Sequence, residues 1–277
     1  MKPKDRYLDI NGLRLHYLDW GNYEHQPMLL LHGFLSHAHA WDDFALNFRS
    51  CYHVIALDQR GHGESEWPED AAYILDNHFA DIAHFVEALN LRKIILVGHS
   101  MGGRNALFYT ACTPHNIERL ILIDIRVGND PLASEALRHL LDSIPLQVNS
   151  IDEIVEKVQT IYPYLSHEIC SRMASYGFKQ MPDGKFIPRD DIRMRQQSQQ
   201  SGYLVEDLWP FLENIPCPTM LIRGKESPFL SREDAERVCK IIPNAEWEEI
   251  PRATHMPVQE NPTAFNKVVS HFLDDRN

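Results

Sequence analysis

The chain has 277 residues, enough to bury a sizeable hydrophobic core, either as one large domain with an insertion or as two small domains. Its net charge of -12 and its pI near 5.6 describe an acidic surface, which repels nucleic-acid phosphates and anionic lipids. We therefore expect neither nucleic-acid binding nor membrane binding.

The cysteines and the N-terminus indicate in which cellular compartment the protein is expected. The five cysteines are widely spaced, odd in number and form no C-x-x-C pair, so neither a disulfide framework nor a zinc site is expected. The N-terminal residues Met-Lys-Pro-Lys-Asp-Arg lack the apolar core of a signal peptide, and no apolar run is long enough to span a bilayer. These features predict a cytoplasmic protein.

The first half of the chain alternates between strand and helix patterns. Two runs, 6–10 and 13–20, flank Asn11-Gly12, a dipeptide typical of a tight hairpin turn. Short apolar runs predict buried strands at 28–31, 54–57, 94–97 and 119–123, with helices at 39–48, 79–89 and 104–112 between them. This alternation predicts a parallel sheet with right-handed crossovers, whose ligands bind beyond the carboxyl ends of the strands.

The alternation stops between about Val127 and Tyr203. Apolar residues there follow helical spacing without a buried β-branched run, and the spacing is interrupted by Pro145, Pro163, Pro182 and Pro188. Because so long a segment cannot be structureless in a compact domain, we predict a helical cap at 127–203 and assign 1–126 and 204–277 to the core. The strand and helix pattern then resumes with a strand at 219–222, a helix at 232–242 with Ser231 as N-cap, a strand at 246–250 and a last helix after Pro262.

Residues 98–102 read Gly-His-Ser-Met-Gly, between a predicted strand and a predicted helix. This G-x-S-x-G pattern is typical of a nucleophile elbow, a sharp turn that only small flanking residues permit. The turn lifts the Ser100 hydroxyl clear of the backbone and turns the Met101 amide toward a developing oxyanion. We therefore predict Ser100 as a nucleophile.

A serine hydroxyl is a weak nucleophile and needs a base, which in turn needs an acidic partner. In chains with this elbow the order is serine, acid, histidine. His255 lies on the loop after the last predicted strand, where such a base belongs, whereas His271 lies inside the terminal helix. We predict His255 as the base and expect the earlier histidines His32, His62 and His99 to brace turns.

Four stretches together resemble the α/β-hydrolase superfamily over nearly the whole chain: His32-Gly33-Phe34, 58–63, 98–103 and His255. The resemblance implies an α/β fold with a mostly parallel eight-stranded sheet, flanking helices and a helical cap inserted after strand 6. It also implies an oxyanion hole formed by the amides of Phe34 and Met101, each worth on the order of 3 to 4 kcal/mol. Asp58 is then expected to stabilise the turn at 60–63.

The acid departs from the commoner pattern of the superfamily. Most members carry an aspartate after the strand that corresponds to 219–222, but here residues 224–227 read Gly-Lys-Glu-Ser. Asp124 ends the strand next to the elbow strand, from which a carboxylate could reach the same imidazole. The YbfF-type acyl esterases, which this chain resembles, combine an aspartate there with a G-x-x-S turn. We therefore predict Asp124 as the acid, with Glu226 and Asp130 as alternatives.

The nucleophile favours one reaction. Dehalogenases and epoxide hydrolases of this superfamily attack with aspartate, whereas this elbow presents serine. We predict acyl transfer to water through an acyl-enzyme, without a cofactor or metal, from a small-molecule ester or thioester. Two other hypotheses stay open: a C–C bond hydrolase, lyase or perhydrolase on the same scaffold, and a non-enzymatic receptor for a small ligand.

The predicted cap is rich in adaptable apolar side chains that suit a small to medium acyl group, although the same residues could simply pack the cap: Tyr162, Tyr164, Met173, Tyr176, Phe178, Met181 and Phe186. Two arginines, Arg104 and Arg126, could orient a substrate carboxylate. Surface or salt-bridge roles are the ordinary expectation for both.

Overall fold

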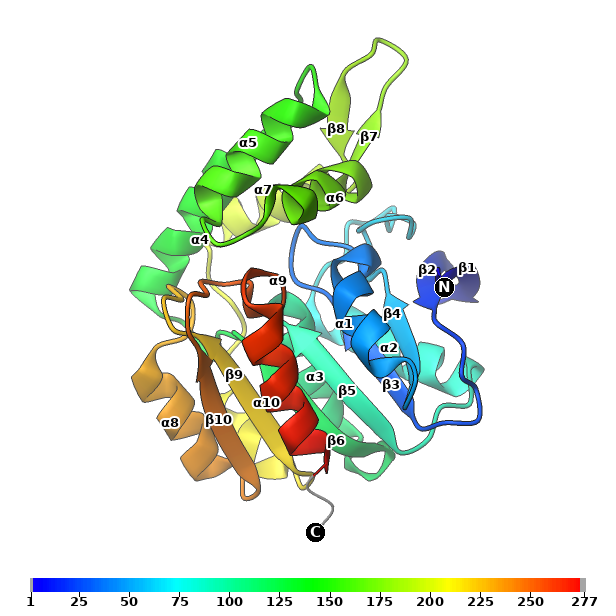
Figure 1. Ribbon diagram of the computed structural model, residues 1–277, viewed down its shortest axis with the longest axis vertical. Coiled ribbons are helices and arrows are strands. Elements are labelled where there is room, and N and C mark those ends of the chain that lie inside the picture. Colours follow the sequence, from blue (N-terminus) through cyan, green and yellow to red (C-terminus); the bar gives the residue numbers. More distant parts are fainter. Residues whose placement is uncertain (1, 275–277) are drawn as a thin grey trace.

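An eight-stranded sheet forms the centre of the molecule in the computed structural model, which describes residues 2–274 (Figure 1). Its strands, in spatial order, are β1 (Lys4–Ile10), β2 (Leu13–Asp19), β4 (His53–Leu57), β3 (Pro27–Leu31), β5 (Ile94–His99), β6 (Ile117–Ile123), β9 (Thr219–Gly224) and β10 (Ala245–Ile250). Strand β2 pairs antiparallel with β1 and β4, and all other pairs are parallel. The predicted eight-stranded, mostly parallel sheet is confirmed.

The strand order positions the site. Strand β3 lies between β4 and β5, so the chain leaves β3 toward one edge of the sheet and later returns to its other side. Such a reversal opens a crevice at the carboxyl ends of the strands. Leu31 on β3 is paired with Gly98 on β5, which brings the loop after β3 beside the turn that carries Ser100.

Helices cover both faces of the sheet (Figure 1). They are α1 (Asp42–Phe48), α2 (Leu75–Ala88), α3 (Met101–Cys112), α8 (Arg232–Ile241), α9 (Pro257–Glu260) and α10 (Pro262–Asp274). Because side chains alternate along a strand, Leu29 and Leu31 join the core under α2, α3 and α8, whereas Met28 and Leu30 join the core under α1 and α10. The sheet is therefore buried on both faces, as its continuous apolar strands require.

Segment 127–203 forms a separate layer over the carboxyl ends of the strands (Figure 1). It contains α4 (Pro131–Ser143), α5 (Ile151–Ile161), α6 (His167–Gly177), α7 (Ile192–Gln200) and a hairpin of β7 (Phe178–Gln180) and β8 (Phe186–Pro188). Each helix begins after a polar N-cap whose side chain accepts a hydrogen bond from the first turn: Asp130, Ser150, Ser166 and Asp191. We refer to this segment as the cap.

The cap has a small core of its own and polar contacts to the rest of the chain. Its buried residues, among them Ile154 and Cys170, pack together with Met256 from the loop after β10. The Asp191 amide donates to the Gly61 carbonyl at 2.9 Å, and its carboxylate accepts from the Tyr73 hydroxyl at 2.5 Å. These contacts fix α7 against the loop after β4. Within residues 2–274, no helix has the length and apolar character needed to cross a bilayer.

Candidate active site

The turn between β5 and α3 has the geometry of a nucleophile elbow. Ser100 sits at φ 51° and ψ -117°, a conformation that a non-glycine residue rarely adopts and that costs of order 1–3 kcal/mol. A Cβ on Gly98 would lie 2.4 Å from the Gly102 carbonyl oxygen, and one on Gly102 would lie 2.3 Å from the Leu31 carbonyl oxygen. Only glycine fits at either position, so the flanking glycines permit the turn that exposes Ser100.

The predicted base lies against the predicted nucleophile. His255, on the loop between β10 and α9, places Nε2 2.9 Å from Ser100 Oγ. This distance allows the hydroxyl to donate a hydrogen bond to the imidazole, the arrangement that general-base activation needs. The two residues are 155 positions apart in the sequence and meet because both follow strands at the carboxyl edge of the sheet.

Asp124, the predicted acid, lies beside the imidazole of His255. It follows β6 at φ 48° and is fully buried, with Oδ1 3.4 Å from His255 Nδ1. The Gly224 amide donates to its Oδ2 at 2.9 Å, and the Ser227 hydroxyl donates to its Oδ1 at 2.5 Å. Ser227 Oγ in turn accepts from the Phe229 amide at 3.0 Å, which directs its own proton toward the carboxylate. The serine in the usual acid position thus holds the carboxylate that faces the histidine.

The two alternative acids are engaged elsewhere. Asp130 caps α4, where its Oδ1 accepts from the Ala133 amide at 2.7 Å. Glu226 Oε2 accepts from the Tyr164 hydroxyl at 2.7 Å at the surface. Among the three candidates, the geometry brings Asp124 to the imidazole.

The loop that carries His255 is held from both sides. The buried Glu260 carboxylate accepts hydrogen bonds from the amides of Thr254 and Met256, at 2.6 and 3.1 Å. Behind it, His99 Nε2 lies 2.7 Å from the His255 carbonyl oxygen. Burial, together with the neighbouring His255, lowers the pKa of His99 to about 3, so this imidazole is neutral and donates its Nε2 proton. No sequence motif indicates the role of Glu260.

The other predicted bracing residues also hold turns. His32 lies 2.8 Å from the Gly33 carbonyl oxygen through Nδ1 and accepts from the Gln59 amide at 3.0 Å through Nε2. Asp58 accepts from the amides of Ala38 and Glu64, at 2.6 and 3.0 Å, and so joins the loops after β3 and β4. Burial opposes the charge on Asp58, but hydrogen bonds, of which that from His16 is the strongest, lower the pKa of the carboxyl.

The expected oxyanion donors flank Ser100. Met101 is the first residue of α3, and Phe34 follows Gly33, at which a Cβ would lie 3.2 Å from Ser100 Cβ. Neither amide is engaged by a loop carbonyl or a side chain within residues 2–274. Both residues line the cavity in front of Ser100, so two N–H groups and the positive end of a helix are available there.

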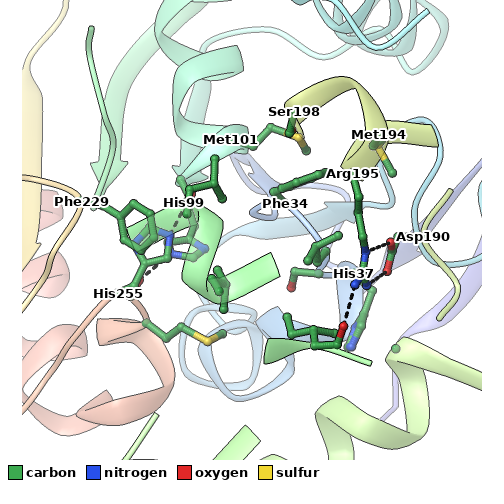
Figure 2. Close-up of a pocket in the computed structure, with 18 of the residues that line it drawn as sticks. Phe34, His37, His99, Met101, Asp190, Met194, Arg195, Ser198, Phe229 and His255 are labelled. Atoms are coloured by element: carbon green, nitrogen blue, oxygen red, sulfur yellow. Dashed lines mark hydrogen bonds and ion pairs between the residues drawn. The ribbon is translucent and has the colours of Figure 1, made fainter. Parts of the chain in front are cut away.

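A cavity of about 400 Å³ lies between the core and the cap. Figure 2 shows His99, His255 and Phe229 on one side of it, the ion pair of Asp190 and Arg195 on another, and Phe34 between them. Of the apolar cap residues singled out in the sequence, Tyr162, Met173 and Phe178 line the cavity. The others lie elsewhere: Tyr176 stacks on His39 at 3.6 Å between ring centroids, Phe186 packs in the cap core, Tyr164 contacts Glu226, and Met181 is exposed.

Within residues 2–274, no group of three or more His, Cys, Asp or Glu residues is arranged to hold a metal ion.

A serine, a histidine and an aspartate thus lie in line at the carboxyl edge of this sheet. The α/β hydrolase fold family matches residues 26–158, and the chain belongs to this family. Epoxide hydrolase 4 of Mus musculus is 30% identical over 96% of this chain and 77% of its own length. The 2-(acetamidomethylene)succinate hydrolase of Mesorhizobium japonicum is 26% identical, over 97% of this chain and 95% of its own.

Solved structures agree with the fold. The crystal structure of E-2-(acetamidomethylene)succinate hydrolase superposes with a TM-score of 0.90 at 24% identity, covering 98% of this chain and 99% of the other. The thioesterase domain from the curacin biosynthetic pathway superposes with a TM-score of 0.80 at 23% identity, covering 98% and 100%. The similar proteins are hydrolases of various kinds, and a particular resemblance to the YbfF-type esterases does not stand out among them.

Proposed function

We propose that this protein is a serine hydrolase that cleaves carboxylic esters or thioesters of small to medium apolar acyl groups through an acyl-enzyme. The observation that carries the proposal is the 2.9 Å contact between Ser100 Oγ and His255 Nε2 at the wall of the cavity. The relatives named as hydrolases and lipases support hydrolysis in general, and the serine elbow argues against the attack by aspartate that epoxide hydrolysis would use.

In the proposed reaction Ser100 Oγ attacks the substrate carbonyl while His255 Nε2 takes its proton. Asp124 keeps the Nδ1 proton directed toward itself and stabilises the imidazolium that forms. The amides of Phe34 and Met101 donate hydrogen bonds to the carbonyl oxygen as negative charge develops on it. His255 then protonates the leaving alcohol or thiol, and water releases the acyl group by the same steps in reverse order.

The side chains around the cavity support an apolar acyl group as part of the substrate. The cap, which we propose as a separate unit at residues 127–203, covers the cavity with aliphatic side chains such as Leu140, Ile154 and Val158. An acyl chain could pack against them without leaving polar groups unpaired. The five cysteines, all free, are in keeping with the cytoplasmic location that we propose.

The test is hydrolysis of p-nitrophenyl esters of graded acyl length by wild type and three variants. We expect Ser100→Ala to lower kcat/KM at least about 1,000-fold and Asp124→Asn to lower it by a similar factor, because each removes an essential part of one proton relay. The control Glu226→Gln should stay within a few-fold of wild type. Full turnover by Ser100→Ala would reject the proposal, and a loss in Glu226→Gln alone would move the acid to Glu226.

A further inference from the structure

The cavity carries more positive than negative charge, although the chain as a whole is at -12. Its cations are Arg104, Arg126, Lys157 and Arg195, and its anions are Asp124, Asp190 and Glu206. Asp124 faces His255 and Ser227, Asp190 is paired with Arg195, and Glu206 is paired with Arg104 at 3.2 Å. Arg126 is the buried arginine of the cavity that takes part in none of these pairs.

Arg126 is buried, with 8% of its surface exposed, yet it has only neutral hydrogen-bond partners. One Nη1 proton goes to Ser134 Oγ at 3.0 Å and one Nη2 proton to the Tyr203 carbonyl oxygen at 2.7 Å. Within residues 2–274 no carboxylate lies within ion-pair distance of its guanidinium. Asp130 acts on it only at longer range, since that carboxylate caps α4.

A guanidinium has five N–H donors, so three of those of Arg126 make no hydrogen bond to a described residue. Removing such a charge from water without a counter-charge is costly. Burial accordingly lowers the pKa of Arg126, but an arginine in a protein stays protonated. Arg104 and Arg195 show the usual solution, a carboxylate partner supplied by the protein itself.

Arg126 is also near the reacting centre. The Ser100 amide donates to the Ile123 carbonyl at 2.9 Å, and Arg126 follows Ile123 by three residues, at most about 11 Å of extended chain. Both Ser100 and Arg126 line the same cavity. An anion held by Arg126 would therefore share one cavity with the carbonyl that Ser100 attacks.

We infer that Arg126 forms an anion subsite, and that the natural ester or thioester carries one carboxylate, either at the far end of an otherwise apolar acyl chain or on its leaving group. A planar guanidinium with three donors to spare matches the two oxygens of a single carboxylate. The inference deepens the proposed hydrolase function and rests on it.

The experiment compares matched charged and neutral esters. Mono-4-nitrophenyl adipate is set against 4-nitrophenyl hexanoate for the acyl side, and 4-acetoxybenzoate against its methyl ester for the leaving-group side. The readout is the ratio of kcat/KM, charged over neutral, with the rate of Ser100→Ala subtracted as background. We expect wild type to prefer the charged member of at least one pair, and Arg126→Met to lower that ratio about 10- to 100-fold.

Two controls separate charge from structure. Arg138→Met removes an exposed arginine of α4 that does not line the cavity, and it should leave the ratio unchanged. Arg126→Lys keeps the charge and should retain part of the preference. Wild type that favours the neutral member of both pairs, or an Arg126→Met ratio equal to that of wild type, would overturn the inference.

A binding measurement keeps this inference distinct from the hydrolase proposal. Benzoate and adipate should bind the inactive Ser100→Ala protein in calorimetry, and Arg126→Met in that background should weaken the binding about 10-fold or more. Binding without ester turnover in wild type would reject the hydrolase proposal and leave the anion subsite standing. Equal binding with and without Arg126 would reject the subsite.

Discussion

Ser227 stands where most α/β hydrolases carry the acid, yet its hydroxyl is directed at another carboxylate. It donates to Asp124 Oδ1 at 2.5 Å, while the same oxygen lies 3.4 Å from His255 Nδ1. Since Ser227 Oγ is itself fixed by the Phe229 amide, it acts as a positioning residue that sets the orientation of the carboxylate. The fully buried Asp124 charge depends on this donor and on the Gly224 amide.

Ser227→Ala should therefore lower kcat about 10-fold while KM changes little, because this residue is not part of the cavity lining. The conservative Ser227→Thr keeps a donor and should restore most of the rate. Ser231→Ala, which removes the N-cap of α8, serves as a control that affects stability and not kcat. A rise in KM with unchanged kcat in Ser227→Ala would contradict the positioning role.

The elements of the core could be predicted because each carries its own signal. Continuous apolar runs mark the buried strands, and Asn11-Gly12 marks the first hairpin. Helix α8 begins after Ser231, whose hydroxyl accepts from the Asp234 amide at 3.0 Å, as expected for an N-cap. Strand limits shifted by one or two residues, since a ladder can continue past the last apolar side chain.

The hairpin of β7 and β8 in the cap escaped prediction. Each strand has three residues, too few for an alternating pattern, and Pro182 in the turn between them fits an interruption between helices equally well. The residues of the candidate site, too, could be predicted only where the sequence carries a signal for them. Ser100 is indicated by its local motif and His255 by chain order and its place after the last strand, whereas the charge balance around Arg126 depends on which carboxylates the folded chain brings near. No local pattern carries that information.

At the scale of the whole molecule, the core contains several neutral buried histidines. Burial lowers the pKa of His32 to about 3, of His37 to about 4 and of His99 to about 3. In the unfolded chain each would titrate near 6.5. Between these values the unfolded state binds more protons than the folded state, so stability rises with pH in this window and falls on acidification.

We therefore expect the free energy of unfolding to fall by several kcal/mol between pH 7 and pH 5, at about 2 kcal/mol for each such histidine. His16 has the opposite effect on the pH dependence of stability. Burial opposes its charge, but the Asp58 and Asp5 carboxylates raise its pKa overall. Its contribution to the free energy of unfolding is therefore complete below pH 6.5 and is lost as the pH rises. Urea unfolding at the two pH values measures the balance. Equal or higher stability at pH 5 would contradict it.

Covalent trapping measures directly whether Ser100 is a nucleophile that His255 activates. Wild type is treated with a fluorophosphonate, and intact-mass and peptide mass spectrometry locate the adduct. We predict one adduct on Ser100, labelling slowed at least about 100-fold in His255→Ala, and none at that position in Ser100→Ala. An unlabelled wild type, or equal labelling with and without His255, would contradict the account.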